Sequence, residues 1–488
     1  MAADSVTPIV VDPGATAWND RFLRHWEHED RPALAWAGGS WSGAELVARA
    51  AGAAALLAAA VRRGRAVPAL LDESPDALAL AAGGALAARP LAPLGTRLPV
   101  ADLAPAVRGL EAEVLLASSA HEPLAREVAV ASGAHLLLVD DVAPVASLPS
   151  AGIGPDDGVA VVHTSGTTGA PKAIIARQRA VAARLAVYDQ VMPLGPGDRF
   201  ASFSGFHHTT GINMAMLALA AGATVLPTAW FSSDAWRTAG ELEVTHALLV
   251  PTMLDRLLAE GSIGAAQPRV LQYGAAPIDV DTLREAMAAM PGSSFLQIFG
   301  QTEISPITAL GAHDHRLAVT GRPELLATVG RAVPGLELRI AAADDHGVGE
   351  LLVRAPHGFA AGSDDWHRTG DLATVDDEGY VTLHGRQGDR IVWAGENVYP
   401  VEVEAALRSH PAVVDVAVVG IPDRRYGETI RAVVVPADPN DPPSLEALQG
   451  HARAHLAAFK VPSELEIVEE LPRNAGGKVL RRLLRPPP

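Results

Sequence analysis

The sequence predicts an α/β fold in which a large N-terminal domain with several sheets, residues 1–385, precedes a small α+β domain, residues 386–488. Two observations support this prediction. In the first part of the chain, apolar segments with helical spacing alternate with short apolar runs, which is typical of parallel sheets covered by helices. In addition, 488 residues exceed the usual size of one domain, and the pattern of elements changes after residue 385.

The first 150 residues predict helices and a parallel sheet. Segments rich in Ala and Leu, with helical spacing, cover residues 43–61 and 74–86. Apolar runs at residues 67–71, 114–117 and 135–139 have the length and composition of buried strands.

Between residues 151 and 330, several predicted strands end in polar or Gly-rich loops. Residues 158–163 lead into TSGTTGAPK, residues 270–273 lead into GAAP, and residues 295–299 lead into GQTE. Ligands of open α/β sheets bind beyond the carboxyl ends of the strands. We therefore expect these loops to surround one site.

The last third of the chain predicts shorter elements. Residues 330–385 are strand-like, and the segment DDEG at 376–379 indicates a hairpin turn. After residue 385 the pattern predicts two helices and three strands, at residues 401–407, 413–419, 430–435, 444–456 and 465–468.

Composition excludes several classes of function. The 39 Lys and Arg residues against 56 Asp and Glu residues give a net charge of −17, which argues against nucleic acid and anionic membranes as partners. The absence of cysteine excludes disulfides, thiolate zinc sites and a cysteine nucleophile. The N-terminus lacks signal-peptide features, and the best apolar stretch, residues 211–227, is expected to be a buried helix that leads into a strand. We therefore expect a cytoplasmic protein without a membrane span.

Lysine is rare in this chain, and each lysine lies in a motif. Only Lys172, Lys460 and Lys478 occur among the 39 positively charged residues. Lysine is a compact charge on a flexible stem, whereas arginine is a planar fork, so these positions are candidates for sites where arginine is unsuitable. Chance is the alternative explanation.

The loop that ends at Lys172 predicts phosphate binding. Its glycines allow backbone N–H groups to approach a phosphate, its hydroxyls add donors, and its lysine adds a charge. It is not a Walker A loop, because the order GxxxxGK[ST] is absent. The candidate phosphate-binding residues are Thr164, Ser165, Gly166, Thr167, Thr168, Gly169 and Lys172.

This loop resembles the phosphate loop of the adenylate-forming superfamily, which contains acyl-CoA synthetases, luciferases and peptide-synthetase adenylation domains. The other motifs of the superfamily follow in the same order through residue 482. The resemblance implies an acyl-CoA synthetase-like fold with a mobile C-terminal domain that alternates between two half-reactions.

The resemblance implies an ATP site with Mg²⁺. GAAP would border the adenine, and FGQTE would place a threonine on the α-phosphate and a glutamate on Mg²⁺. An aspartate in RTGD would bind the ribose hydroxyls, the arginine after Gly385 would lie near the ribose and phosphate, and the lysine in LPRNAGGK would be catalytic. These residues are Gly274, Ala275, Ala276, Phe299, Gly300, Gln301, Thr302, Glu303, Asp371, Arg386 and Lys478. For Glu303, a favourable charge at a helix N-terminus is the alternative role.

The resemblance also implies an acyl pocket and a CoA acceptor. His208, in the segment FHHTTG at 206–211, matches the histidine that borders the acyl pocket, with Tyr273 and Phe299 nearby. Lys460, in LAAFKVP, matches an acyl-CoA synthetase signature, although an ordinary surface lysine is the alternative, and Gly395 lies in the segment expected beside pantetheine. These pocket segments contain no Arg or Lys, so we expect a largely apolar monocarboxylic acid: aryl, fatty or polycyclic.

Several departures from the superfamily pattern leave other functions open. Gly388 stands in the hinge where Asp or Lys is usual, and Trp393 and Ala394 are bulkier than the usual residues beside the pantetheine tunnel. The alternatives are a specialist in one half-reaction, an enzyme that loads a carrier protein, and a nucleotide-binding protein with a decayed site. The identity of the acid and a homodimeric state are also open.

Overall fold

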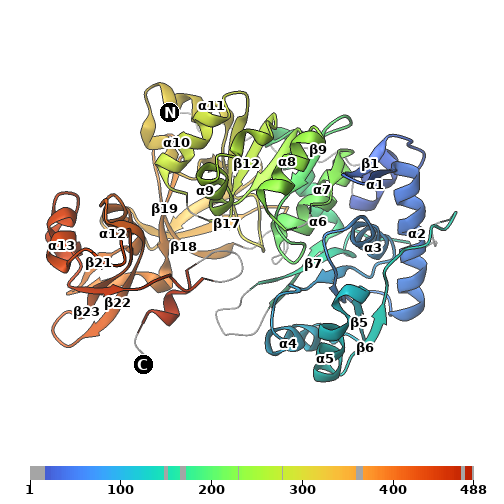
Figure 1. Cartoon of the computed structure of the whole chain (residues 1–488), viewed down its shortest axis with the longest axis horizontal. Helices are drawn as coiled ribbons and strands as arrows, with labels where there is room; N and C mark the ends of the chain where they lie inside the picture. Colours follow the sequence, from blue (N-terminus) through green and yellow to red (C-terminus); the bar gives the residue numbers. More distant parts are fainter. Residues whose placement is uncertain are drawn as a thin grey trace. The chain divides into compact units, whose positions relative to one another are not determined.

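The computed structural model describes residues 17–147, 152–164, 172–228, 230–276, 278–358, 366–473 and 479–485 (Figure 1). The chain divides into two compact units. Unit 1 comprises Met1–Glu337 and Arg354–Trp366, and unit 2 comprises Leu338–Val353 and His367–Pro488. The α/β class with a large multi-sheet N-terminal part is confirmed.

The first sheet of unit 1 has six strands in the order β6-β5-β3-β4-β7-β8. All neighbouring strands are parallel except the edge strand β8, which runs antiparallel to β7. The strands predicted from the first 150 residues lie here with nearly the expected bounds. The strands are β3 (Val67–Leu70), β4 (Leu91–Pro93), β5 (Val114–Ala117), β6 (His135–Leu138), β7 (Gly158–Thr164) and β8 (Lys172–Arg177).

The second sheet of unit 1 has nine strands in the order β15-β14-β13-β12-β11-β9-β10-β1-β2. Its centre is parallel, and its outer strands β2, β14 and β15 run antiparallel to their neighbours. The strands are β1 (Pro32–Trp36), β2 (Gly39–Ser42), β9 (Arg199–Ser202), β10 (Thr224–Leu226), β11 (His246–Leu249), β12 (Val270–Gly274), β13 (Ser294–Phe299), β14 (Thr308–Leu310) and β15 (Arg331–Ala332).

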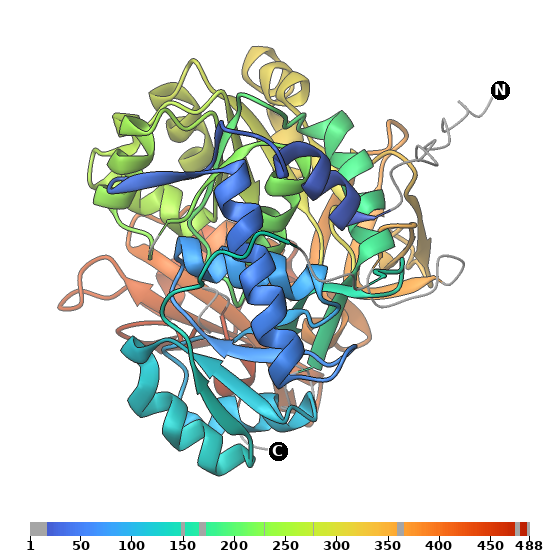
Figure 2. The same ribbon diagram turned by 90° about the vertical axis from the view of Figure 1, so that its right-hand side faces the viewer.

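Helices of unit 1 use small residues to pack closely. Helix α2 (Gly43–Ala60) begins at a capping box formed by Ser42 and Glu45, and it packs against α3 (Pro75–Leu86). A Cβ added at Gly83 would lie 2.5 Å from the carbonyl oxygen of Ala50, so the two helices approach closely at a glycine. Figure 2 shows α2 as the long blue helix. By length and composition α2 could also cross a membrane, but it is an Ala-rich helix whose inner face lies in the protein core.

The remaining helices of unit 1 follow the connections between strands. The apolar stretch 211–227 forms a helix that leads into β10, as the sequence predicted. The helices are α1 (Trp18–Trp26), α4 (Val100–Gly109), α5 (Glu122–Ser132), α6 (Gln178–Val191), α7 (Met214–Ala221), α8 (Ser233–Glu241), α9 (Pro251–Ala259), α10 (Val280–Ala289) and α11 (Ala312–Thr320).

Unit 2 contains a four-stranded sheet and a five-stranded sheet, and in the latter β24 runs parallel to β23 while the other paired strands are antiparallel. One has the order β16-β17-β18-β19, with β16 (Glu337–Ala341), β17 (Gly349–Arg354), β18 (His367–Val375) and β19 (Val381–Arg386), and its hairpin falls at the predicted turn. The other contains β20 (Ile391–Trp393), β21 (Glu396–Val398), β22 (Val413–Asp423), β23 (Gly427–Pro436) and β24 (Glu464–Ile467), with helices α12 (Pro400–Arg408) and α13 (Leu445–Arg453).

The division between the units differs from the predicted boundary after residue 385. Tyr399, which follows β21, is buried with Val348 and Leu372, and its hydroxyl donates a hydrogen bond of 2.7 Å to Asp344. These contacts join the four-stranded sheet to the residues that follow it, so both sheets belong to one compact unit. A hinge at residue 385 stays a prediction.

Candidate functional site

The predicted phosphate loop is closed at its base by two paired strands. Thr164, at the end of β7, pairs with Lys172, at the start of β8, in antiparallel register. The side chain of Lys172 is exposed. The residues between them, Ser165 to Gly169 among them, lie outside the described part of the chain.

His163 precedes this loop in a buried position. Neither ring nitrogen has a hydrogen-bond partner among the described residues. Burial lowers the pKa of His163 to about 4, so the ring is neutral at physiological pH. β7 contacts the turn Thr209–Asn213, which continues the His208 segment, so His163 comes from a strand next to the predicted acyl pocket.

The adenine-side loop begins where β12 and β13 lie closest. Gly274 pairs with Ile298 and has φ of +154°, and a Cβ there would lie 2.2 Å from the carbonyl oxygen of Ile298. Ala275 continues with φ of +67°, and its side chain is exposed. Ala276 is half-buried. The backbone therefore turns sharply at the strand end.

The GQTE loop follows the neighbouring strand β13 directly. The N–H of Gln301 donates to the carbonyl of Ile304 at 2.8 Å, and the N–H of Ile304 donates back at 3.1 Å. A Cβ at Gly300 would lie 2.7 Å from Oγ of Ser305, so the turn requires glycine. This tight turn leaves Thr302 and Glu303 half-buried at the same sheet edge as GAAP.

The residues at this edge fit a magnesium nucleotide. The described residues contain no group of three or more His, Cys, Asp or Glu side chains that could hold a metal ion. Mg²⁺ is commonly bound by one or two carboxylates together with substrate phosphates, and Glu303 offers one such carboxylate. The glycines at the ends of β12 and β13 allow the two strand ends and the following turn to pack closely, which keeps the GAAP and GQTE loops at one edge of the sheet.

Tyr273 does not lie where the sequence predicted it. Its side chain is buried, and its hydroxyl is hydrogen-bonded to Nε2 of His315 at 2.9 Å. Its ring also contacts Phe295. Alternation along β12 therefore turns Tyr273 into the core behind the sheet, and it does not frame an acyl pocket.

The segment with His207 and His208 lies beyond the end of β9. The two imidazole rings are 4.0 Å apart. Burial, with the neighbouring His208 as a smaller cause, lowers the pKa of His207 to about 3, and burial also lowers the pKa of His208. Both rings are therefore neutral at physiological pH.

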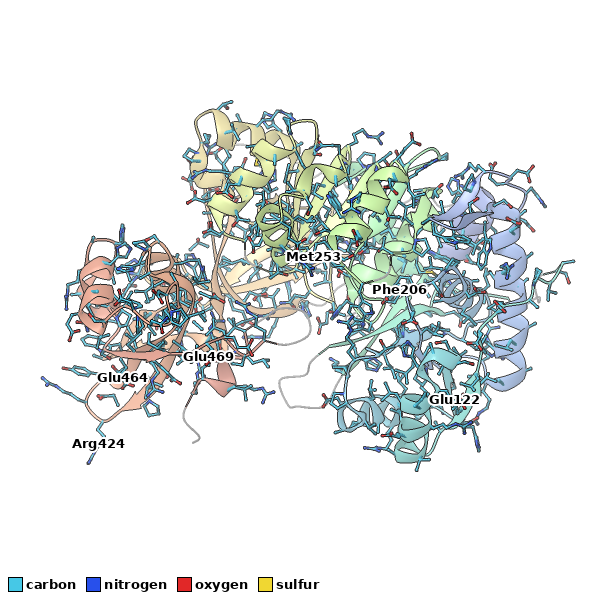
Figure 3. The ribbon with its side chains drawn as sticks, viewed as in Figure 1. Glu122, Phe206, Met253, Arg424, Glu464 and Glu469 are labelled. Atoms are coloured by element: carbon cyan, nitrogen blue, oxygen red, sulfur yellow. The ribbon has the colours of Figure 1, made fainter. Side chains whose placement is uncertain are left out.

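Two charged residues at this segment were missed by the sequence analysis. Glu73 accepts a hydrogen bond of 2.9 Å from the N–H of Phe206, which Figure 3 labels. Arg97 stacks on Trp230 at 3.8 Å, and the Trp230 ring lies 6.2 Å from that of His207. Both residues follow parallel strands, β3 and β4, so the rule about carboxyl strand ends would have found them if applied to the first 150 residues.

In unit 2, two predicted nucleotide-binding residues contact each other. Nε of Arg386 lies 2.9 Å from Oδ1 of Asp371, and Nη1 of Arg386 donates to the carbonyl of Thr369 at 2.8 Å. Asp371 pairs with Arg386 across β18 and β19 and is buried. The strand pairing therefore places a carboxylate and a guanidinium side by side.

The predicted acceptor residues of unit 2 lie around an aromatic stack. The ring of Trp393 stacks on Tyr426 at 4.8 Å and lies 6.2 Å from Phe459. Ala394 and Gly395 follow with φ of +50° and +91°. Nζ of Lys460 lies 2.6 Å from Glu402, so this lysine is held in an ion pair.

The catalytic lysine predicted by the sequence, Lys478, lies outside the described residues. The backbone on either side of it is anchored. Arg473 and Val479 form an isolated antiparallel β-bridge, and the N–H of Leu480 donates a hydrogen bond of 2.7 Å to the carbonyl of Pro472. Leu471 is buried against Ala417 and Val433 of the larger sheet.

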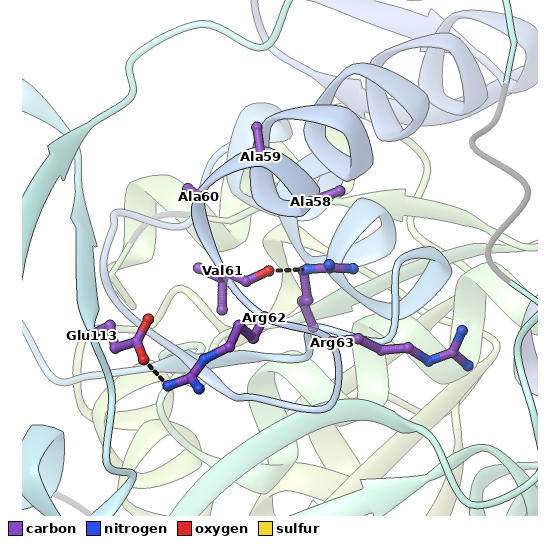
Figure 4. A pocket seen from close by; sticks show the side chains of 8 residues that line it. Ala58, Ala59, Ala60, Val61, Arg62, Arg63 and Glu113 are labelled. Carbon is purple, nitrogen blue, oxygen red and sulfur yellow. Dashed lines mark hydrogen bonds and ion pairs between the residues drawn. The ribbon is translucent and has the colours of Figure 1, made fainter.

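A separate surface pocket contains none of the predicted site residues. It lies at the end of α2, and Figure 4 shows Arg62 paired with Glu113. Nε of Arg89 donates a hydrogen bond to the carbonyl of Val61. These pairings occupy the polar groups that line it. The pocket does not bear on the site described above.

Comparisons with known proteins agree with the motifs. The AMP-binding enzyme family matches residues 23–362, and the AMP-binding enzyme C-terminal domain matches residues 402–478. An indoleacetate–CoA ligase of Aromatoleum aromaticum is 35% identical over 352 residues, which cover 67% of this chain and 66% of the relative. A 2-succinylbenzoate–CoA ligase of Bacillus licheniformis is 29% identical and covers 80% of this chain and 83% of the relative.

Two solved structures share the fold of this chain. The amide bond synthetase McbA of Marinactinospora thermotolerans superimposes with a TM-score of 0.82 at 29% identity, covering 96% of this chain and 98% of that one. ATP-bound MatB of Rhodopseudomonas palustris gives a TM-score of 0.84 at 27% identity, with the same coverage. The chain belongs to the AMP-binding enzyme family within the adenylate-forming superfamily, and the two curated relatives named above are acid–CoA ligases.

Proposed function

We propose that this protein is an ATP-dependent acid–CoA ligase that activates a largely apolar monocarboxylic acid as its acyl-adenylate and transfers the acyl group to CoA. The observation that carries the proposal is the placement of GAAP and GQTE at the ends of the paired strands β12 and β13. The CoA ligases among the relatives support the choice of acceptor. The reaction would take place in the cytoplasm.

In the first step a carboxylate oxygen of the acid attacks the α-phosphorus of ATP, and the bond to pyrophosphate breaks. Negative charge grows on the phosphate oxygens, where preplaced donors and cations stabilise it. Thr302 and Lys478 would supply these groups, and residues 164–172 would hold the leaving pyrophosphate. Mg²⁺ held at Glu303 would supply further positive charge. Asp371, an acceptor when ionised, suits the ribose hydroxyls, and Arg386 beside it would contact ribose and phosphate.

In the second step the sulfur of CoA attacks the acyl carbon, AMP leaves with the bonding electrons, and the thiol loses its proton. Lys460 and Gly395 would contact CoA. The neutral rings of His207 and His208 suit an acyl pocket, since they add polarity without charge. Arg97 and Glu73 bring charge close to these rings, so acids with a second polar group belong in the substrate panel.

The test is a pair of assays across a panel of aryl, fatty and polycyclic acids, with and without a second polar group. Acid-dependent ATP–pyrophosphate exchange measures the first half-reaction, and thioester formation from a supplied acyl-adenylate measures the second. We expect both with the same acid. Adenylate binding without turnover of any acid would favour the nucleotide-binding alternative, and a lack of thioester with free CoA would contradict the proposal.

One observation favours a second acceptor. Trp393 fills the space between Tyr426 and Phe459 next to Ala394 and Gly395. A bulky ring in this segment would hinder pantetheine and admit a smaller or differently presented nucleophile. The assay of the second half-reaction therefore includes CoA, a phosphopantetheinyl carrier protein and simple amines as competing acceptors. The acceptor to which the acyl group is transferred fastest is taken as the preferred one.

A further inference from the structure

Glu73 joins the two sheets of unit 1 at the histidine segment. It follows β3 of the six-stranded sheet, whereas Phe206 follows β9 of the nine-stranded sheet. The hydrogen bond from the Phe206 N–H to Oε1 of Glu73 spans 133 positions of sequence. A single carboxylate thus fixes the start of the segment that carries His207 and His208.

The ring of His207 is held by close packing on the same segment. A Cβ at Gly205 would lie 2.6 Å from Cε1 of His207 and 3.3 Å from Oε1 of Glu73. A Cβ at Gly95 would lie 3.3 Å from Cδ2 of His207. The ring therefore fits between two glycines, and a shift of the backbone at Phe206 would carry the ring with it.

The carboxyl of Glu73 accepts this hydrogen bond from a half-buried position, and the bond itself requires an acceptor oxygen but no charge. Burial raises its pKa, and the hydrogen bond from Phe206 opposes that rise. Burying a carboxylate is unfavourable, and a neutral acceptor could bond one backbone N–H equally well. Arg97 stacks on Trp230 beside His207, and its positive charge also opposes the rise in the pKa of Glu73.

We propose that Glu73 is a positioning residue of the acyl site, which holds residues 206–208 so that the His207 and His208 rings present a fixed wall to the acid. This inference rests on the proposed function, because it assigns the acid to the His208 side of unit 1. It predicts that Glu73 controls the affinity for the acid and leaves ATP affinity unchanged.

Three variants separate this role from a general effect on folding. Glu73→Ala removes the acceptor oxygen, and Glu73→Gln keeps an acceptor while removing the ionisable group. Asp72→Asn is the matched control, because Asp72 is the adjacent carboxylate, is exposed, and pairs with His121 away from the histidine segment.

The kinetic measurement is KM for the acid and KM for ATP in the exchange assay. Since leaving a buried N–H without its acceptor has roughly a tenfold to hundredfold effect, we expect Glu73→Ala to raise KM for the acid at least about tenfold. KM for ATP should stay within about twofold, and Glu73→Gln and Asp72→Asn should stay near the wild type. Equal changes in both KM values, or no rescue by glutamine, would overturn the proposal.

The second measurement does not depend on activity. Hydrogen exchange of the peptide that contains Phe206 should accelerate in Glu73→Ala and remain slow in Glu73→Gln and Asp72→Asn. If the wild-type protein activates no acid, the proposed function fails. Accelerated hydrogen exchange in Glu73→Ala would then show that Glu73 links the two sheets without a role in acid binding. That result would also overturn the proposal that Glu73 positions the acyl site. Unchanged exchange in Glu73→Ala would show that the hydrogen bond does not hold the segment.

Discussion

The two units hold their predicted site residues by different physical means. In unit 1, glycines at Gly274 and Gly300 allow close approaches of other residues, and burial keeps His208 neutral. In unit 2, opposite charges hold the residues, with Arg386 on Asp371 and Lys460 on Glu402. The difference suggests that unit 1 is sensitive to volume and protonation, whereas unit 2 is sensitive to the removal of a charge.

The largest expected effect comes from removing a charge of unit 2. Lys478→Ala should lower acid-dependent ATP–pyrophosphate exchange about a thousandfold, since a preplaced group that stabilises transition-state charge contributes on that scale. Thioester formation from a supplied adenylate should be largely spared. Arg482→Ala, at an exposed arginine nearby, is the control. Equal losses in both assays would mean that the lysine has another role.

The next effect comes from adding volume in unit 1. Gly274→Ala places a Cβ 2.2 Å from the Ile298 carbonyl at φ of +154°, so we expect the free energy of unfolding to fall by about 3 kcal/mol. Thermal or denaturant unfolding measures this. Gly292→Ala has no atom within 4 Å of the added Cβ and should be nearly neutral. Similar values for the two variants would contradict the close approach.

Protonation should also weaken unit 1. Burial lowers the pKa of His357 to about 4, and its Nε2 is bonded to the Pro306 carbonyl at 2.7 Å. The unfolded chain binds a proton on His357 at a higher pH than the folded protein does. The contribution of neutral His357 to the free energy of unfolding is therefore complete above about pH 6.5. It falls by about 3 kcal/mol as the pH falls towards 4. His357→Gln should reduce the slope of unfolding free energy against pH by about one proton. An unchanged slope would exclude this histidine as a cause.

A smaller effect is expected from the carboxylate of unit 2. Asp371→Asn removes the charge that faces Arg386, and it should raise KM for ATP about tenfold, which is the scale of one charged hydrogen bond. Asp377→Asn, at the exposed hairpin tip, should leave KM unchanged. A normal KM for ATP in Asp371→Asn would place the ribose elsewhere.

The smallest effect concerns the acceptor side. Lys460→Met should raise KM for CoA only about threefold, and the loss of its partly exposed ion pair should cost less than about 1 kcal/mol of stability. Glu402→Gln breaks the same pair and should match the stability change without the change in KM. If both variants change KM for CoA equally, the ion pair affects CoA binding only by stabilising the local structure, and Lys460 does not contact CoA.

Local sequence patterns predicted the elements and the order of the motifs because their causes are local. The hairpin at 376–379 forms since turn residues fix it, and the strands that end in GAAP and GQTE follow from apolar runs. Side-chain direction was less predictable. Tyr273 faces the core because of its register on β12, and register depends on neighbouring strands that the local pattern does not specify.

The boundary between the units shows the same limit. The change of pattern after residue 385 is real, because a sheet ends at Arg386. The burial of Tyr399 against Val348 and Leu372 nevertheless joins the residues on either side of it into one compact unit. These contacts join Tyr399 to residues 51 and 27 positions earlier in the chain, and composition does not reveal such contacts.

By itself, the sequence determined the family and the chemistry of this protein, because a binding motif is a short run of residues whose types and spacing are dictated by the ligand. Tertiary structure alone decided which distant residues join those motifs. Glu73 meets Phe206, and Arg97 meets Trp230, only where two sheets bring their strand ends together, and that meeting depends on the packing of the whole unit.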